Sequence, residues 1–237
     1  MKLSKLGLAP IAAAVLALSA VSANAATYQS FLEYSGVTAW GGDNTSNTPP
    51  YFGKVTLTEG GSGTGAYVDI HVDLYGPNGA SSGFKFVDTG NAGVHSPFAF
   101  NLTNTNQSTW IVDTNSPWVL NSVNPSDQSP FGSFTTSLDC CANGGANAIN
   151  PPLDFRMGST NGLTFLGGGD HFASNAGGWW FAADVVNTAN GSTGMVAARD
   201  LVPTTPVPEP ETYAMLLAGL GLMGFVARRR QRKLAAA

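Results

Sequence analysis

The chain has 237 residues, of which only 11% are charged, and it is rich in glycine (29 residues) and proline (14 residues). Soluble domains average about 25% charged residues, so this composition disfavours long solvated helices and favours short strands joined by turns. Residues 26–206 carry 13 acidic and four basic side chains, a net charge of −9, which argues against nucleic acid as a partner.

The first 25 residues have the pattern of a signal peptide. Lys2 and Lys5 precede an apolar run over residues 6–20, and Ala23 and Ala25 form a small-x-small cleavage site. The apolar run is shorter than the ~20 residues that a membrane span needs. We therefore expect signal peptidase to cut after Ala25 and residues 26–202 to form an exported domain.

The pattern of this domain predicts an all-β fold. In residues 67–75 the apolar side chains of Val68, Ile70, Val72 and Leu74 alternate with polar ones, as in a strand with one buried face. Residues 51–59 predict a second strand, joined to the first by a glycine-rich loop. Further strands are expected at residues 84–87, 98–102, 110–113, 118–121, 131–138, 153–157, 163–166, 179–186 and 194–201. Many short strands separated by turns favour an antiparallel β-sandwich, for which a jelly-roll arrangement is one solution.

The polar face of the strand at residues 67–75 holds the candidate metal ligands. Asp69, His71 and Asp73 would point to one side and offer oxygen and imidazole ligands. Exposed strand faces carry polar residues by default, so whether a metal binds stays open, and no cofactor is expected. Asp170 and His171 are a weaker pair, because neighbouring side chains of a strand point to opposite sides.

No residue pattern marks a catalytic centre. The Gly-x-Ser-x-Gly sequence at residues 79–83 lacks the preceding strand and following helix of a hydrolase elbow. A glycosidase would need two carboxylates across a cleft, and nothing in the sequence singles out such a pair. We therefore assign no catalytic residue and expect a protein that is not an enzyme.

Two pairs of adjacent residues remain as candidates for other roles. The rings of Trp179 and Trp180 are candidates for glycan contact, although such rings usually fill a core. Because adjacent residues of a strand face opposite sides, at least one ring should lie off the core face. Cys140 and Cys141 allow a vicinal disulfide, an intermolecular bridge or two free thiols, all compatible with an exported compartment.

The C-terminal region has the pattern of a membrane-sorting signal. Residues 203–211 form a proline-rich linker, residues 212–227 an apolar segment, and residues 228–237 a basic tail. A helix of 16 residues reaches about 24 Å, which is sufficient for a transmembrane helix in a thinned bilayer. The cluster of Arg228, Arg229 and Arg230 predicts a cytoplasmic C-terminus and an exported domain outside the inner membrane.

This tail resembles the PEP-CTERM sorting signal of Gram-negative, exopolysaccharide-producing bacteria. The resemblance rests on the motif Pro208-Glu209-Pro210, the glycine-bearing apolar segment and the arginine cluster. It implies that exosortase recognises the tail, that the precursor is anchored in the inner membrane, and that the mature form goes to the cell surface or the extracellular matrix.

The resemblance describes sorting and does not define what the exported domain does. Our first hypothesis is a non-catalytic surface or matrix protein of a biofilm that acts in adhesion or associates with exopolysaccharide. The alternatives are a secreted carbohydrate-active enzyme and a lectin on the same β-sandwich scaffold.

Overall fold

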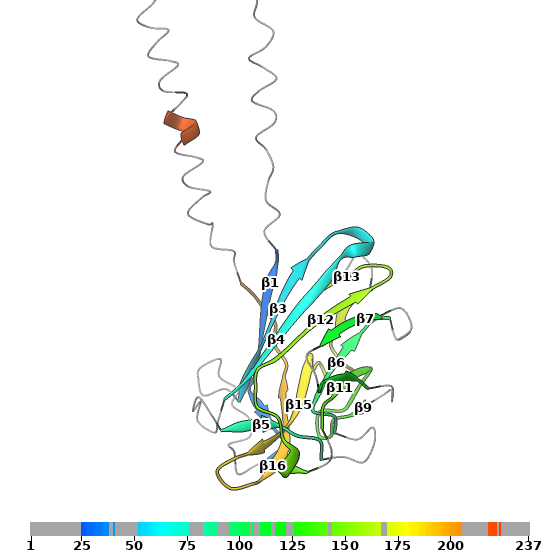
Figure 1. Cartoon of the computed structure of the whole chain (residues 1–237), viewed down its shortest axis with the longest axis vertical. Coiled ribbons are helices and arrows are strands. Elements are labelled where there is room, and N and C mark those ends of the chain that lie inside the picture. Colours follow the sequence, from blue (N-terminus) through cyan, green and yellow to red (C-terminus); the bar gives the residue numbers. More distant parts are fainter. Residues whose placement is uncertain are drawn as a thin grey trace, which may run out of the picture.

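The computed structural model describes residues 25–37, 40, 52–75, 83–89, 95–104, 106, 110–114, 117–121, 126–141, 144–166, 170–204, 218–221 and 223. Over these residues the fold is all-β and its strands pair antiparallel, apart from one short parallel pair (Figure 1). Among the described residues, helical structure is confined to two single 3-10 turns, to Trp40 and to residues 218–221 and 223. The all-β prediction is therefore confirmed.

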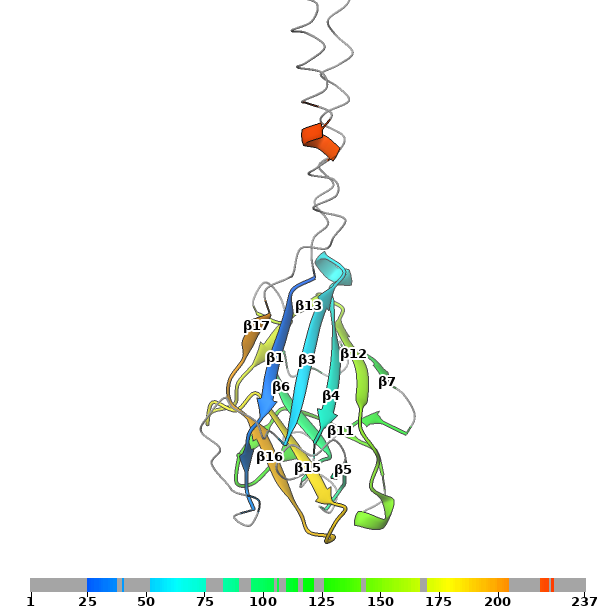
Figure 2. The same ribbon diagram turned by 90° about the vertical axis from the view of Figure 1, so that its left-hand side faces the viewer.

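Sheet A has six strands in the order β17-β1-β3-β4-β12-β7. Their bounds are β17 (Val202–Thr204), β1 (Thr27–Leu32), β3 (Gly53–Gly60), β4 (Tyr67–Leu74), β12 (Leu153–Ser159) and β7 (Trp110–Thr114). In Figure 2, β1, β3, β4 and β12 run side by side. Burial along β4 alternates at every residue, so one side of the sheet is buried and the other meets solvent, as its apolar and polar periodicity requires.

Sheet B lies opposite, with the strand order β13-β14-β6-β15-β16-β2. Their bounds are β13 (Leu163–Thr164), β14 (Asp170–Ala173), β6 (Phe98–Leu102), β15 (Phe181–Asn187), β16 (Thr193–Ala198) and β2 (Tyr34–Ser35). Three further strands attach to this order: β11 (Thr136–Asp139) pairs with β6, β8 (Val119–Leu120) pairs with β11, and β5 (Phe84–Phe86) pairs with β15. The strands β9 (Ser126–Asp127) and β10 (Ser133–Phe134) form a separate hairpin.

Aromatic rings fill the space between the two sheets. Phe155 of sheet A lies 5.8 and 6.0 Å, between ring centroids, from Phe100 and Phe98 of sheet B, and Phe181 stacks on Phe98 at 5.9 Å. Burying one such ring stabilises the fold by about 1.5–3 kcal/mol. The core between the sheets is therefore the main source of stability.

The outer side of sheet B is also buried. A second apolar cluster lies there, in which Phe131 and Phe134, from the segment that carries the β9–β10 hairpin, are packed with Ala182 and Met195 of the sheet. Sheet B is therefore covered on both sides. The outer side of sheet A instead carries half-exposed polar side chains over β3 and β4, so this is the sheet face that stays open to solvent in the part of the chain that the structure describes.

The structure differs from the expected elements in three places. Strands β1, β2, β9 and β14 were not predicted, and the single strand expected at residues 131–138 is two strands, β10 and β11. Pro203 and Thr204, assigned to the linker 203–211, instead belong to β17, which pairs with β1. The ordered sheet thus continues to Thr204.

Most of the two sorting segments lies outside the described residues. This holds for the signal peptide up to residue 24, for Pro208, Glu209 and Pro210, and for Arg228, Arg229 and Arg230. Of the transmembrane helix expected at residues 212–227, the structure describes only residues 218–221 and 223. Among all residues described, no helix has both the length and the apolar character needed to cross a bilayer.

Candidate functional site

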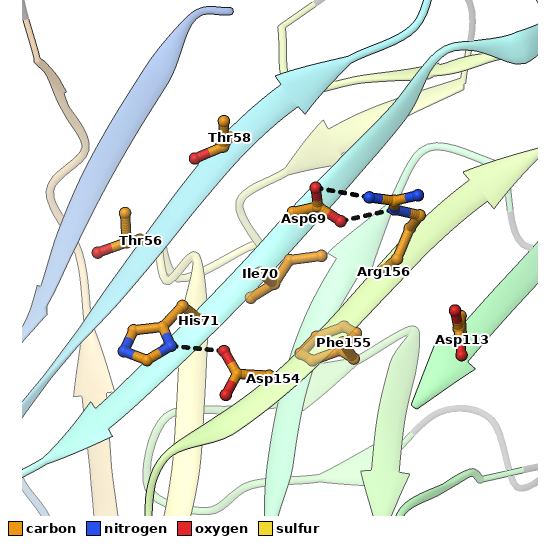
Figure 3. A pocket seen from close by; sticks show the side chains of 9 residues that line it. All are labelled: Thr56, Thr58, Asp69, Ile70, His71, Asp113, Asp154, Phe155 and Arg156. Carbon is orange, nitrogen blue, oxygen red and sulfur yellow. Dashed lines mark hydrogen bonds and ion pairs between the residues drawn. The ribbon is translucent and has the colours of Figure 1, made fainter. Parts of the chain in front are cut away.

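The open side of sheet A gathers polar side chains from four neighbouring strands, and we call it the polar face. Its members are Lys54, Thr56 and Thr58 of β3, Asp69, His71 and Asp73 of β4, Asp154 and Arg156 of β12, and Asp113 of β7. Cross-strand register places them in rows, so that Thr56 lies beside His71 and His71 beside Asp154. A shallow cavity of about 360 Å³ lies over this face (Figure 3).

One end of the face is organised by Arg156. Its guanidinium donates two hydrogen bonds to the carboxylate of Asp69, with Nε 2.6 Å from Oδ1 and Nη2 3.0 Å from Oδ2. The same guanidinium lies 3.8 Å from the ring centroid of Tyr67. A bidentate pair that also stacks on an aromatic ring holds the guanidinium in one position.

The other end of the face is organised by His71. Its Nδ1 lies 2.5 Å from Oδ1 of Asp154, and its Nε2 lies 3.2 Å from Oδ1 of Asp73. Asp73 in turn lies 3.9 Å from Nζ of Lys54. Burial alone lowers the pKa of His71, but the hydrogen bond to Asp154 and the charge of Asp73 outweigh it and raise the pKa above 6.5. These contacts favour the protonated form of the imidazole, which bridges two carboxylates.

The three predicted metal ligands lie on one face, as their spacing requires, but each has another partner. Asp69 binds Arg156, and His71 and Asp73 bind each other and their neighbours. Within the described ranges of the chain, no group of three or more His, Cys, Asp or Glu side chains is arranged to hold a metal ion. A metal site at Asp69, His71 and Asp73 stays a prediction, and this arrangement does not favour it.

The weaker pair, Asp170 and His171, points to opposite sides of β14. The carboxylate of Asp170 is buried and accepts hydrogen bonds from Ser159, from Asn104 at 2.9 Å and from Asn161 at 3.5 Å. Burial by itself raises the pKa of Asp170, but these hydrogen bonds outweigh it and hold the pKa below its ordinary value. The site joins three segments of the fold, which is a structural role.

The two candidate glycan-binding tryptophans face opposite sides of sheet B. The ring of Trp180 lies 5.4 Å from that of Phe165 and packs against the main core. The ring of Trp179 lies 4.9 Å from both Tyr34 and Phe131, against the second apolar cluster. Both rings are half-buried, so each serves packing, and neither forms an open aromatic platform.

The two cysteines are bonded to each other. Cys140 is buried and Cys141 is half-buried, and their sulfur atoms form a vicinal disulfide after β11. No free cysteine remains in the chain. The link closes a ring between neighbours and does not connect distant strands, so it adds no cross-link to the core.

Sequence reasoning missed Asp154, Arg156 and Asp113 as members of the polar face. They come from β12 and β7, and Arg156 lies 87 residues from its partner Asp69. The alternation of exposed and buried residues at the start of β12 places Asp154 and Arg156 on an outer face. Nothing local indicates that β12 pairs with β4.

The fold is all-β and mostly antiparallel, and the outer face of sheet A is open and polar. Residues 206–231 match the model of the PEP-CTERM protein-sorting motif. The comparisons with curated proteins and with solved structures give no match. The chain therefore carries a PEP-CTERM sorting signal at its C-terminus. This motif indicates an exported protein that is anchored in the membrane before sorting and is processed there by exosortase.

Proposed function

We propose that this chain is a non-catalytic cell-surface or matrix protein that associates with exopolysaccharide through the polar face of sheet A. The observation that carries the proposal is an open sheet face on which hydroxyl, carboxylate, imidazole and guanidinium groups stand side by side over a shallow cavity. Sugar hydroxyls both donate and accept hydrogen bonds, so a surface that holds both kinds of partner in fixed positions suits them.

The ion pairs of the face support a role without catalysis. A glycosidase needs two carboxylates that act on the substrate as acid, base or nucleophile. Here Asp69 is held by Arg156, and Asp154 and Asp73 are held by His71. Asp113 is the single carboxylate among the described residues of the face that forms no salt bridge. The paired groups are better suited to hold a ligand than to transfer protons.

Isosteric removal of hydroxyl groups tests the proposal. We expect the variant Thr56→Val/Thr58→Val, in the full-length chain purified in detergent, to bind purified exopolysaccharide roughly 5- to 150-fold more weakly, since each of the two lost hydrogen bonds contributes about 0.5–1.5 kcal/mol. The matched control is Thr193→Val, an exposed strand threonine on sheet B, which should bind like the parent chain. Equal binding by all three proteins would contradict the proposed face.

The same preparation separates the proposal from the enzymatic alternative. Reducing-sugar release is measured in parallel with binding to a glycan array. Binding without release is the expected outcome. Release of reducing ends, lost on Asp154→Asn, would instead establish a carbohydrate-active enzyme.

A further inference from the structure

Building on the proposed function, we propose that the polar face selects cationic, amino-sugar polysaccharides over uronic-acid polysaccharides. Four carboxylates, those of Asp69, Asp73, Asp113 and Asp154, stand there against Lys54, Arg156 and His71. Each of these three basic groups already contacts a carboxylate. An anionic polymer would therefore have to displace an internal partner, whereas an ammonium group could approach Asp113, whose charge acts on Arg156 without forming a salt bridge.

Two of the acceptors line the cavity from the neighbouring strands β12 and β7. Asp113 is exposed on β7 and lies opposite Arg156 in the strand register. Asp154 is half-exposed and uses only Oδ1 toward His71. Figure 3 shows the two carboxylates on either side of Phe155. A polymer lying across β3, β4, β12 and β7 would thus meet the hydroxyl groups of Thr56 and Thr58 on β3 and the carboxylates of Asp154 and Asp113 on β12 and β7.

The net charge of the whole domain also favours a cationic polymer. Residues 26–206 carry a net charge of −9, so the field of the domain repels a polyuronate and attracts a polyamine. His71 competes with such a ligand for two carboxylates, those of Asp154 and Asp73, whereas Lys54 and Arg156 each contact one. Removing this internal cation should therefore strengthen the binding of a cationic polymer.

Three polysaccharides of similar length test this selectivity with the full-length chain in detergent: chitosan, dextran and alginate. We expect retention in the order chitosan, dextran, alginate, with chitosan binding weakened by added salt, since exposed charges are screened within about 10 Å at 0.1 M. Asp113→Asn should weaken chitosan binding about 1.5- to 5-fold, the range for an exposed charge pair. His71→Asn should strengthen it by a similar factor.

Asp127→Asn is the matched control, because Asp127 is an exposed strand aspartate on the β9–β10 hairpin, away from sheet A. It should bind chitosan like the parent chain. If Asp127→Asn weakens binding as much as Asp113→Asn, only the overall charge attracts the polymer and the assignment to this face is overturned. Weaker binding by His71→Asn would likewise overturn the competing role of the imidazole.

The remaining outcomes separate this inference from the proposed function. Alginate binding as strong as chitosan binding would overturn the charge selectivity but leave the association with polysaccharide standing. Retention on polylysine equal to that on chitosan would overturn the specificity for amino sugars and indicate a cationic protein as the ligand. No retention on any polysaccharide, together with no effect of Thr56→Val/Thr58→Val, would overturn the proposed function itself.

Discussion

Asp184 is the residue whose charge the fold tolerates least. Its side chain is fully buried on β15. Its Oδ2 accepts hydrogen bonds from the backbone N–H of Thr89, at 2.9 Å, and from the Thr89 hydroxyl. Its Oδ1 has no partner among the described residues. Burial raises the pKa, and although the Thr89 hydrogen bonds lower it, the result is a pKa of about 7.

This raised pKa predicts that the domain loses stability as pH rises. The folded state holds the Asp184 proton at higher pH than the unfolded chain does, so the stabilisation is complete below about pH 4 and is lost as pH rises through about 7. Asp184→Asn resembles the protonated acid and removes this dependence. We expect its free energy of unfolding to fall less than that of the parent domain between pH 5 and pH 8, by roughly 2–4 kcal/mol.

Urea unfolding of the exported domain, residues 26–204, at the two pH values measures the difference. Asp127→Asn, on an exposed strand position, should keep the parental slope. The pKa values of Glu33 and Asp139 are also raised, in each case chiefly by burial, so a smaller slope of the same sign should remain in Asp184→Asn. A slope equal to that of the parent domain would contradict the role of Asp184.

The side chains of the polar face show how far single residues could be predicted. The alternation in residues 67–75 placed Asp69, His71 and Asp73 on one face, because the period of a strand is a local property. Their partners Asp154 and Arg156 lie 83 and 87 residues from the residues that they bind. Strand pairing over such distances depends on the whole fold, so the ion pairs that occupy the candidate ligands were not visible in the sequence.

At the scale of elements, the turn that joins β3 to β4 meets the turn that joins β12 to β13. The backbone N–H of Leu163 donates to the carbonyl of Ala66 at 2.9 Å. Gly162 has a φ of +80°, and a Cβ placed there would lie 2.0 Å from the carbonyl oxygen of Gly63. Gly63 has a φ of +57°, yet a Cβ there would meet nothing within 4 Å. The two glycines share a backbone conformation and differ in the space around them.

We therefore expect Gly162→Ala to destabilise the domain more than Gly63→Ala. Both changes force a side chain into a left-handed conformation, at about 1–2 kcal/mol. In Gly162→Ala the new Cβ also clashes with the backbone of the other turn, so one of the two turns must move. Its total loss in free energy of unfolding should therefore be roughly 3 kcal/mol or more. Thermal unfolding compares the two variants, and equal shifts in Tm would show that the contact between the turns contributes nothing.

Two of the strands that sequence reasoning missed, β14 and β17, have different physical causes. β17 contains Pro203, which reads as a linker residue, but β17 is at the edge of sheet A, where proline is tolerated because its missing N–H leaves no ladder bond unmade. β14 begins with Asp170 and His171, and only the hydrogen bonds from distant segments allow that carboxylate to be buried. In contrast, β4 and β6 were predicted within one residue of their ends, because their apolar residues mark them locally.

At the scale of the whole molecule, β1 and β17 fix how the domain is attached. Thr27 pairs with Thr204, and the Thr204 hydroxyl donates to the Thr27 carbonyl at 2.8 Å. The first and the last strand of the domain therefore meet at one end, which is also the end of the β3–β4 turn (Figures 1 and 2). The polar face runs along the side of sheet A, so a tether at this end leaves it accessible to a polymer.

This arrangement separates sorting from folding, and that separation can be tested in the producing cell. The sheet ends at Thr204, whereas the sorting motif covers residues 206–231. Pro208→Ala/Glu209→Ala/Pro210→Ala should therefore leave the domain folded and exported but stop its processing. Immunoblots of cell fractions should show the full-length chain retained with the inner membrane and the released form strongly reduced.

Pro203→Ala, which lies in β17 outside the motif, should be processed normally. Release of the triple variant at the parental level would show that processing does not depend on these three residues.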